Sequence, residues 1–313
     1  MEIKKYKTGD ESKILELFKL AFGKEMSIEY WTWRFKSNPF SNEILIYLMW
    51  EENEIIGHYA VSPVEMIINS KITKTALSMT TMTDPKHNGK GIFTQLSSHL
   101  YDQLQNHLGY KMVWGFPNNN SHYAFIKNLN WKNIATIPIL SLQLSKLKSI
   151  TNISFEVIKN FDNEIASQFK NLDKLIKINK TTAYLDWRYT QNPFADYTIL
   201  KLKSNLGCVV YKLINSFSKP DNYEIDILEL NFSNDTNVLN ELLNAIILNE
   251  NKQIEQLNIW NSIFSSDYLL LKKAGFISQM PLTYLGYLNF DSNNILAENY
   301  ANWEINFGYS DIF

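Results

Sequence analysis

Apolar side chains recur at helical spacing in residues 93–108, directly after the apolar run 76–82. The apolar positions of the first stretch are Phe93, Leu96, Leu100, Leu104 and Leu108. They lie three or four residues apart, which places them on one face of a helix. The run before them is typical of a buried strand, and a polar loop at 83–91 joins the two. The pattern therefore predicts a strand, a sharp turn and a helix in succession.

The segments around this unit alternate between short apolar strands and amphipathic helices. Polar turns at 51–54 and 69–71 join neighbouring strands, so we predict antiparallel hairpins there. The apolar run 111–116 predicts a parallel strand, because a helical crossover returns the chain in the same direction. The expected helices are 10–22, 27–35 and 117–129, and the expected strands are 44–50, 55–62, 64–68, 72–82, 111–116 and 137–144.

The same order of elements begins again in the second half of the sequence. Three matches occur in order, at offsets that shrink slowly along the chain. They are Trp33–Phe40 with Trp187–Phe194, Gly57 with Gly207, and Ser121–Trp131 with Ser266–Phe276. Ordered matches of this kind indicate duplication of a whole domain. We predict a first domain over 1–148, a second over 149–290 and a C-terminal tail over 291–313.

Composition excludes several classes of protein. With 30 Lys and Arg against 32 Asp and Glu, the net charge is −2, and no basic stripe suited to nucleic acid is present. No apolar run reaches about 18 residues, and the first residues lack the apolar core of a signal peptide. The single cysteine, Cys208, fits a reducing compartment. We expect a cytoplasmic protein with no membrane span and no nucleic-acid partner, and its oligomeric state stays open.

The loop 83–91 carries the clearest chemical signal. Gly89 and Gly91 stand at alternate positions where the helix begins. Glycine lets the backbone turn tightly and expose its N–H groups, which together with the helix dipole form an anion site. The corresponding stretch 228–237 of the second half contains no glycine. The contrast predicts that the first domain binds a phosphate-bearing ligand and that the second keeps only the scaffold.

The sequence K-H-N-G-K-G at 86–91, between a strand and a long helix, resembles the acyl-CoA-binding motif of the GNAT superfamily of N-acyltransferases. Residues 121–131 resemble a later helix of the same fold. The resemblance implies an α/β fold with two tandem GNAT-like domains, each a mixed, mostly antiparallel sheet flanked by helices. The first domain would bind acyl-CoA, and the second is a degenerate copy.

The resemblance also implies the residues that bind the cofactor. The CoA pyrophosphate would be held by the loop and the helix start, namely Asn88, Gly89, Lys90, Gly91, Ile92, Phe93 and Thr94. Met82 and Thr83 would pair with the pantetheine arm, and Asn118 would face the cofactor. Two positions depart from the family pattern. Lys86 stands where Gln or Arg is usual, and Ile126 stands where a tyrosine general acid is usual.

Acyl transfer to an amine requires a deprotonated nitrogen, a polarised thioester carbonyl and close alignment of the two. The backbone N–H at Met82 is the expected oxyanion donor. His58 is the first candidate for the general base, because an imidazole titrates near neutral pH. Tyr123 is a substitute candidate for the general acid. A purely structural role is the alternative for both side chains.

The tandem arrangement resembles bacterial N-acyltransferases that modify nucleotide-linked amino sugars for surface polysaccharide. This resemblance implies transfer of an acetyl or short hydroxyacyl group, from acetyl-CoA or a 3-hydroxyacyl-CoA and without a metal, to a small-molecule amine. The expected acceptor is a sugar of the dTDP-3-amino-3,6-dideoxyhexose type. The alternatives are an aminoglycoside- or peptide-directed N-acetyltransferase and a non-catalytic CoA-binding protein.

The aromatic tail after Asn302 has no counterpart in the first half. It either covers an apolar surface or returns to the cleft between the domains. In the second case, Asp311 or the terminal carboxylate is expected to contact the acceptor.

Overall fold

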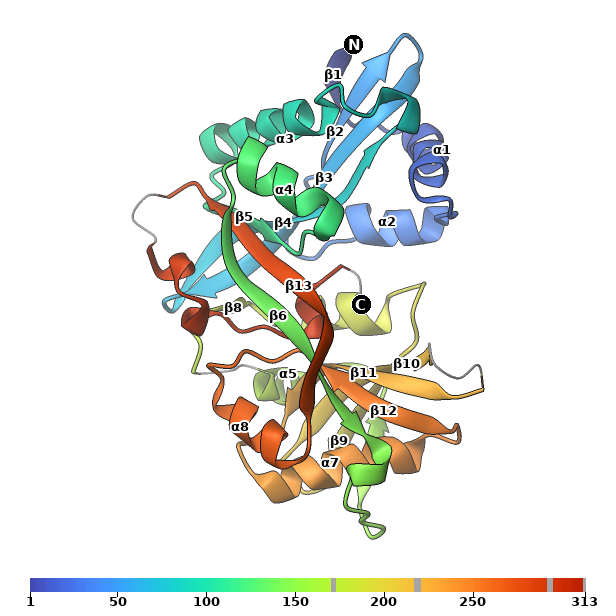
Figure 1. Ribbon diagram of the computed structural model, residues 1–313, viewed down its shortest axis with the longest axis vertical. Helices are drawn as coiled ribbons and strands as arrows, with labels where there is room; N and C mark the ends of the chain where they lie inside the picture. Colours follow the sequence, from blue (N-terminus) through green and yellow to red (C-terminus); the bar gives the residue numbers. More distant parts are fainter. Residues whose placement is uncertain (170–172, 217–220, 292–294, 312–313) are drawn as a thin grey trace. The chain divides into compact units, whose positions relative to one another are not determined.

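A computed structural model of the chain describes all residues except 170–172, 217–220, 292–294 and 312–313 (Figure 1). The chain divides into two compact units. Unit 1 comprises Met1–Ala135 and Tyr284–Glu298, and unit 2 comprises Thr136–Thr283 and Asn299–Phe313. No helix in the described part of the chain combines the length and the apolar character that a membrane crossing requires.

Unit 1 contains the predicted strand–turn–helix succession at its centre. Its elements are β1 (Glu2–Lys5), α1 (Glu11–Phe22), α2 (Ile28–Lys36), β2 (Leu45–Glu51), β3 (Glu54–Ile68), β4 (Lys71–Thr83), α3 (Ile92–Asp102), β5 (Met112–Gly115) and α4 (Asn119–Asn128). The sheet order is β1-β2-β3-β4-β5, followed by the end of β13 (Ile277–Asn289). β4 and β5 run parallel, and the other neighbours pair antiparallel.

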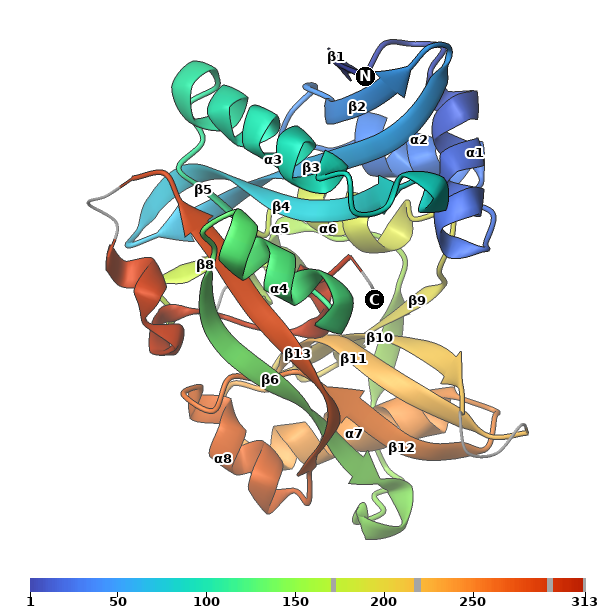
Figure 2. The ribbon, with the colours of Figure 1, turned by 45° about the horizontal axis from the view of Figure 1, so that its top comes forward.

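The hairpins predicted at 51–54 and 69–71 and the parallel strand at 111–116 are confirmed. The predicted strands 55–62 and 64–68 form one long strand, β3. At the second hairpin, Asn69 and Ser70 both have positive φ, which is the backbone of a tight turn that matches strand twist. α3 and α4 pack against one face of the sheet, and α1 and α2 cover the other (Figures 1 and 2).

Unit 2 repeats this succession. Its elements are β6 (Lys132–Gln143, from Thr136), β7 (Phe155–Ile158), α5 (Asn163–Gln168), β8 (Ile176–Ile178), α6 (Thr182–Leu185), β9 (Tyr197–Leu202), β10 (Cys208–Asn215), β11 (Tyr223–Asn231), α7 (Thr236–Asn249), β12 (Ile254–Ile259), α8 (Ser266–Lys273) and the first part of β13. The sheet order is β6-β12-β11-β10-β9-β7. β11 and β12 run parallel, as β4 and β5 do in unit 1.

Each unit receives the last strand of the other repeat. β6 starts in unit 1, passes into unit 2 at Thr136 and pairs there with β12. β13 starts in unit 2, enters unit 1 at Tyr284 and pairs with β5. The chain therefore passes from one compact unit to the other inside β6 and inside β13, whereas the domain boundaries predicted at 148 and 290 follow the sequence repeats. The difference arises from strand pairing, which sequence similarity does not record.

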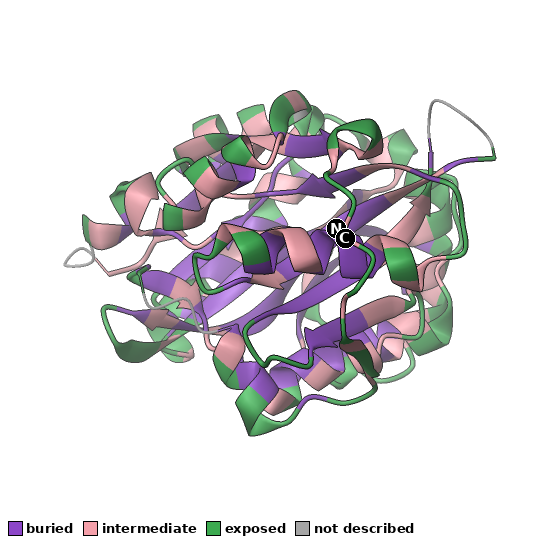
Figure 3. Ribbon diagram, turned by 90° about the horizontal axis from the view of Figure 1, so that it is seen from below, coloured by how far each residue is buried: buried purple, intermediate pink, exposed green. Residues whose placement is uncertain are grey.

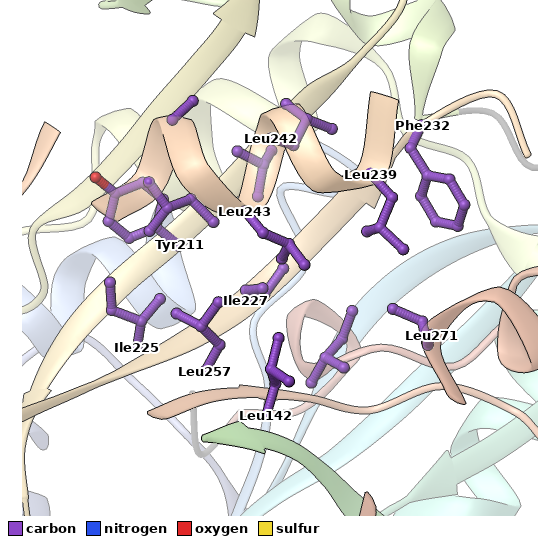
Figure 4. Packing of buried hydrophobic residues seen from close by; sticks show 14 of the residues in the cluster. Leu142, Tyr211, Ile225, Ile227, Phe232, Leu239, Leu242, Leu243, Leu257 and Leu271 are labelled. Atoms are coloured by element: carbon purple, nitrogen blue, oxygen red, sulfur yellow. The ribbon is translucent and has the colours of Figure 1, made fainter. Parts of the chain in front are cut away.

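The apolar stripes of the central helices form the core of each unit. In α3, Leu96 and Leu100 are fully buried against the sheet. In unit 2, Leu239, Leu242 and Leu243 of α7 point toward apolar side chains of the strands (Figure 4). Buried residues concentrate on the strands and on the helix faces turned toward them (Figure 3).

The repeated motif W-R-aromatic-x-x-N-P-F builds the same local turn in both units. Asn38 Oδ1 accepts a hydrogen bond from the N–H of Phe40 at 2.8 Å, and Asn192 Oδ1 accepts one from the N–H of Phe194 at 2.9 Å. The preceding arginine is buried in both copies. The motif is therefore part of the scaffold in each unit.

The predicted tail divides between the two units: residues 291–298 belong to unit 1 and residues 299–313 to unit 2. Trp303, Phe307 and Tyr309 are buried, and the Phe307 ring lies 4.9 Å from that of Trp260. The Trp303–Ser310 stretch thus packs on an apolar surface of unit 2, and contact of Asp311 or the terminal carboxylate with an acceptor stays a prediction. The terminal carboxylate lies outside the described residues.

The matched glycines Gly57 and Gly207 let a helix lie close to a strand in each unit. A Cβ at Gly57 would lie 2.3 Å from Cγ2 of Ile92 in α3. A Cβ at Gly207 would lie 2.8 Å from side-chain carbons of Val238 and Leu242 in α7. Both repeats therefore have a glycine at the place where the central helix lies against the sheet.

We predict that Gly57→Ala lowers the free energy of unfolding by about 1–3 kcal/mol, because the added methyl group overpacks the contact with Ile92. Urea unfolding of the full chain measures this loss. The double variant Gly57→Ala/Ile92→Ala should lose less than the sum of the two single variants, since Ile92→Ala removes the clashing atom. Strict additivity of the two substitutions would contradict the proposed contact.

Candidate active site

The parallel strands of unit 1 separate at their carboxyl ends. The ladder between β4 and β5 ends at Leu77 and Trp114, whereas β4 continues to Thr83. The strands are still close one residue beyond this point, since a Cβ at Gly115 would lie 3.3 Å from the carbonyl oxygen of Ser78. Beyond Ser78, this edge of β4 has no partner strand among the described residues, and we call this unpaired stretch the opening. Such openings at the ends of parallel strands are common ligand sites, and a free strand edge can pair with an extended ligand.

A β-bulge lies in this part of β4. His58 pairs with Met82 and Ala60 pairs with Met79. The two residues Thr80 and Thr81 therefore lie opposite the single residue Tyr59 of β3. Thr80 has a φ of 47°, which is rare for a β-branched residue. Strain of this kind costs about 1–3 kcal/mol and persists only where the surroundings enforce it.

His58 holds the strained peptide from the β3 side. Its Nδ1 lies 2.8 Å from the carbonyl oxygen of Thr80. A carbonyl only accepts hydrogen bonds, so Nδ1 carries the proton and donates. In a trans peptide the N–H points away from the C=O. The N–H of Thr81, which belongs to the same peptide, is therefore directed away from His58 and toward the opening.

The other N–H groups of this edge follow from strand alternation. The N–H of Asp84 donates to the carbonyl of Ile56 in β3 at 3.0 Å. Because successive residues of a strand face opposite sides, the N–H of Met82 also faces β3. The N–H of Thr83, like that of Thr81, faces the opening. The oxyanion donor predicted at Met82 is therefore better placed at Thr81, one residue earlier.

The environment of His58 differs from that of an exposed base. The side chain is fully buried, and this burial lowers its pKa to about 4, although the bond to Thr80 opposes the shift. Nε2 is buried and has no hydrogen-bond partner among the described residues. The imidazole is neutral at pH 7. This geometry favours a role in holding the bulge over direct contact with a substrate ammonium.

The glycine loop leaves the start of α3 open. Gly89 and Gly91 have φ values of 80° and 72°, and Gly91 is the N-cap residue of α3. No side chain caps this helix start, so the N–H groups of its first turn point outward without an intrahelical partner. Lys86 and Lys90 are exposed beside them. Backbone donors, the helix dipole and two lysines together suit a pyrophosphate.

The residues expected on the neighbouring helix have other contacts. Asn118 caps α4, and its Oδ1 accepts from the N–H groups of Asn120 and Ser121 at 3.0 Å each. The Tyr123 side chain is 68% exposed. Ile126, at the usual tyrosine position, packs against the apolar core of unit 1.

Sequence reasoning missed a buried hydroxyl network beneath the bulge. The hydroxyl of Tyr59 lies 2.8 Å from Ser78 Oγ and 2.7 Å from the hydroxyl of Tyr101. Tyr101 also accepts from Nε1 of Trp131 at 3.1 Å. Burial raises the pKa of Tyr59 to about 12. These bonds tie β3, β4 and α3 together under the opening, and no local sequence pattern signals them.

Unit 2 has the same opening but a different loop. The β11–β12 ladder ends at Ile227, and β11 continues to Asn231. The loop reaches positive φ at Ser233 and Asn234 without glycine. Asp235 then caps α7, with its carboxylate accepting from the N–H of Asn237 at 2.7 Å. A protein carboxylate thus occupies the position that stays open to an anion in unit 1. Within the described residues, no group of His, Cys, Asp or Glu side chains is arranged to hold a metal ion.

Comparisons with known proteins agree with this geometry. Residues 2–134 match the family model of the acetyltransferase (GNAT) domain. A GCN5-related N-acetyltransferase from Anabaena variabilis ATCC 29413 is similar in structure, with a TM-score of 0.69, 11% identity, and coverage of 93% of this chain and 73% of that chain. Eis1 from Mycobacterium abscessus is similar with a TM-score of 0.63, 12% identity, and coverage of 96% and 76%.

The N-myristoyltransferase of Saccharomyces cerevisiae, solved with bound myristoyl-CoA, is similar with a TM-score of 0.60, 10% identity, and coverage of 92% and 78%. Comparison with curated protein sequences finds no match. At these identities the solved structures establish the fold, which extends over both units. Residues 2–134 therefore match the GNAT acetyltransferase domain, which indicates an N-acyltransferase, in a chain with the fold of two tandem GNAT-like domains.

Proposed function

We propose that unit 1 transfers an acetyl or short 3-hydroxyacyl group from CoA to the primary amine of a nucleotide-linked amino sugar. The observation that carries acyl transfer is the open strand edge of β4 between a strained bulge and an uncapped helix start. The choice of acceptor, a sugar of the dTDP-3-amino-3,6-dideoxyhexose type, is supported by the resemblance of the tandem arrangement to acyltransferases of surface polysaccharide synthesis.

In this proposal the residues from Asn88 to Thr94 bind the pyrophosphate, and Lys86 adds positive charge beside them. Met82 and Thr83 position the pantetheine arm along the edge of β4. Asn118 contributes from the start of α4 on the far side of the opening. Contacts at three places along acyl-CoA would hold its thioester in a fixed position. Such alignment supplies a large share of the rate enhancement of a two-substrate reaction.

The chemical step forms a C–N bond and breaks the thioester C–S bond. The N–H of Thr81 stabilises the negative charge that develops on the carbonyl oxygen. The amine passes a proton to solvent water, and CoA leaves as a thiolate that takes up a proton. We assign His58 to holding the peptide that carries this N–H. Tyr123, exposed on α4, keeps the expected role of proton donor to the thiolate.

Release of free thiol from acyl-CoA tests the proposal. The full-length chain is mixed with acetyl-CoA or 3-hydroxybutyryl-CoA and with a dTDP-3-amino-3,6-dideoxyhexose, an aminoglycoside or a peptide amine. We expect thiol release that depends on the amino sugar and exceeds the blank without amine. Thiol release with only the aminoglycoside or only the peptide would identify that amine, in place of the amino sugar, as the acceptor. Binding of CoA without release for any amine would instead favour a non-catalytic CoA-binding protein.

A further inference from the structure

Unit 2 has a cavity of about 260 Å³, partly open to solvent, where β11 and β12 separate. The ends of both strands, the start of α8 and the tail stretch 303–306 line it. β11 and β12 correspond in the repeat to β4 and β5, so the cavity occupies the place of the opening described for unit 1. It lies entirely within unit 2.

The tail makes this site unsuitable for CoA. The Phe307 ring packs on Trp260 at the end of β12. A Cβ at Gly308 would lie 2.2 Å from the hydroxyl of Tyr189 and 2.7 Å from Oε1 of Glu229, so the backbone itself fits tightly beside β11. With Asp235 capping α7, neither the pyrophosphate position nor the strand edge is open. The remaining space suits a compact ligand.

The positive charges that line the cavity are already used by the protein. Lys180 Nζ donates to the carboxylates of Glu229 at 2.8 Å and Glu304 at 3.0 Å. Lys174 Nζ donates to two backbone carbonyls, at 2.7 and 2.9 Å. These bonds take two of the three N–H donors of each ammonium group.

Hydrogen-bond acceptors, in contrast, are left over. Oδ1 of Asn261, Oδ1 of Asn306 and Oε1 of Gln168 are buried and have no hydrogen-bond partner among the described residues. All three residues line the cavity. The orientation of the Asn306 amide is fixed, since its Nδ2 donates to Glu229 at 2.8 Å. Buried acceptors are normally satisfied, so a ligand here is expected to supply donors.

The charge of the lining points in the same direction. Asp173, Glu229, Asp267 and Glu304 contribute carboxylates, against the two ammonium groups of Lys174 and Lys180. We propose that this cavity binds a small organic ammonium ion that carries further N–H or O–H donors. The proposal concerns unit 2 alone and does not depend on the acyl transfer proposed for unit 1.

The environment of Asp267 favours a bound cation. Its pKa is raised to about 6 by burial, and by repulsion from Asp173 and Glu304. An ammonium ion bound nearby would offset this repulsion and stabilise the ionised carboxylate.

Calorimetric titration of the full-length chain tests the proposal with three probes. Glucosamine and putrescine are compact ammonium ions. Glucose is the uncharged analogue of glucosamine, with a hydroxyl group in place of the amine. We expect at least one ammonium probe to bind with a millimolar or lower Kd, and glucose to bind at least about tenfold more weakly than glucosamine. Preference for glucosamine would indicate an amino sugar ligand, and preference for putrescine a polyamine.

Two variants locate the binding. Asn261→Leu removes an unpartnered acceptor and keeps the branching of the side chain at Cγ, and Asp267→Asn removes one charge. Each should weaken binding of the ammonium probe by about tenfold, while CoA binding and the midpoint of thermal unfolding stay unchanged. The proposal is overturned if neither ammonium probe binds, if glucose binds as well as glucosamine, or if both variants bind as tightly as the original chain.

Discussion

Gly91→Asp is expected to weaken binding of CoA by about a hundredfold, because placing like charges together costs several kcal/mol. Gly91 has a φ of 72° and caps α3. Asp and Asn tolerate this backbone conformation better than other residues, and an added Cβ meets only Gln95 Nε2, at 3.7 Å. The new carboxylate would accept from the helix N–H groups and exclude the pyrophosphate, as Asp235 already does at α7. Calorimetric titration with CoA measures the change.

Two controls separate charge from backbone strain. Gly91→Asn has nearly the same shape as Gly91→Asp and no charge, so its loss of affinity should be clearly smaller. Gly109→Asp places the same charge at a residue with the same φ of 72° and open space around its Cβ. That variant should bind CoA normally. Equal losses for Gly91→Asp and Gly91→Asn would show that strain, rather than anion competition, governs the loop.

His58→Leu is expected to lower kcat by about ten- to a hundredfold, since removal of one oxyanion donor costs about 10²–10³ in kcat and here the donor is only displaced. The KM for acyl-CoA should change little, because the glycine loop is untouched. Leucine fills much of the buried space but cannot donate to the carbonyl of Thr80. Without that bond the strained peptide can relax and turn the N–H of Thr81 away from the opening.

His58→Asn distinguishes this role from proton transfer. Asn carries an N–H donor on its δ atom, as His58 does at Nδ1, but cannot act as a base near neutral pH. Steady-state kinetics with acetyl-CoA and an accepted amine should show that Asn restores most of the activity lost in His58→Leu. If both variants are equally inactive, the result supports His58 as the general base, the role that the sequence predicts.

The parts of the fold that rest on local patterns could be predicted from the sequence. The stripe from Phe93 to Leu108, the two hairpin turns and the glycine loop each depend on residues close together in the chain. Their structures follow from short-range geometry: helical period, turn chemistry and positive φ at Gly89 and Gly91. The duplication was also visible, because Gly57 and Gly207 serve the same close contact in both copies.

The parts of the site that depend on pairing between strands could not be predicted in the same way. The bulge at Thr80 shifts the register by one residue, and this shift decides whether Met82 or Thr81 directs its N–H toward the opening. Nothing in the sequence around Thr80 marks that shift. The burial of His58 likewise results from three-dimensional packing. The sequence alone therefore cannot distinguish this histidine from a solvent-accessible base.

The passage of β6 and β13 between the units has a consequence for how the second repeat could diverge. The edge of β5 in unit 1 is covered by residues 286–289, which the second repeat encodes. A chain cut near residue 148 would leave this edge bare and would deprive β12 of its partner, β6. The second repeat can therefore do without a glycine loop but not without its scaffold. Selection on unit 1 alone would be enough to retain a second repeat that has no anion site of its own.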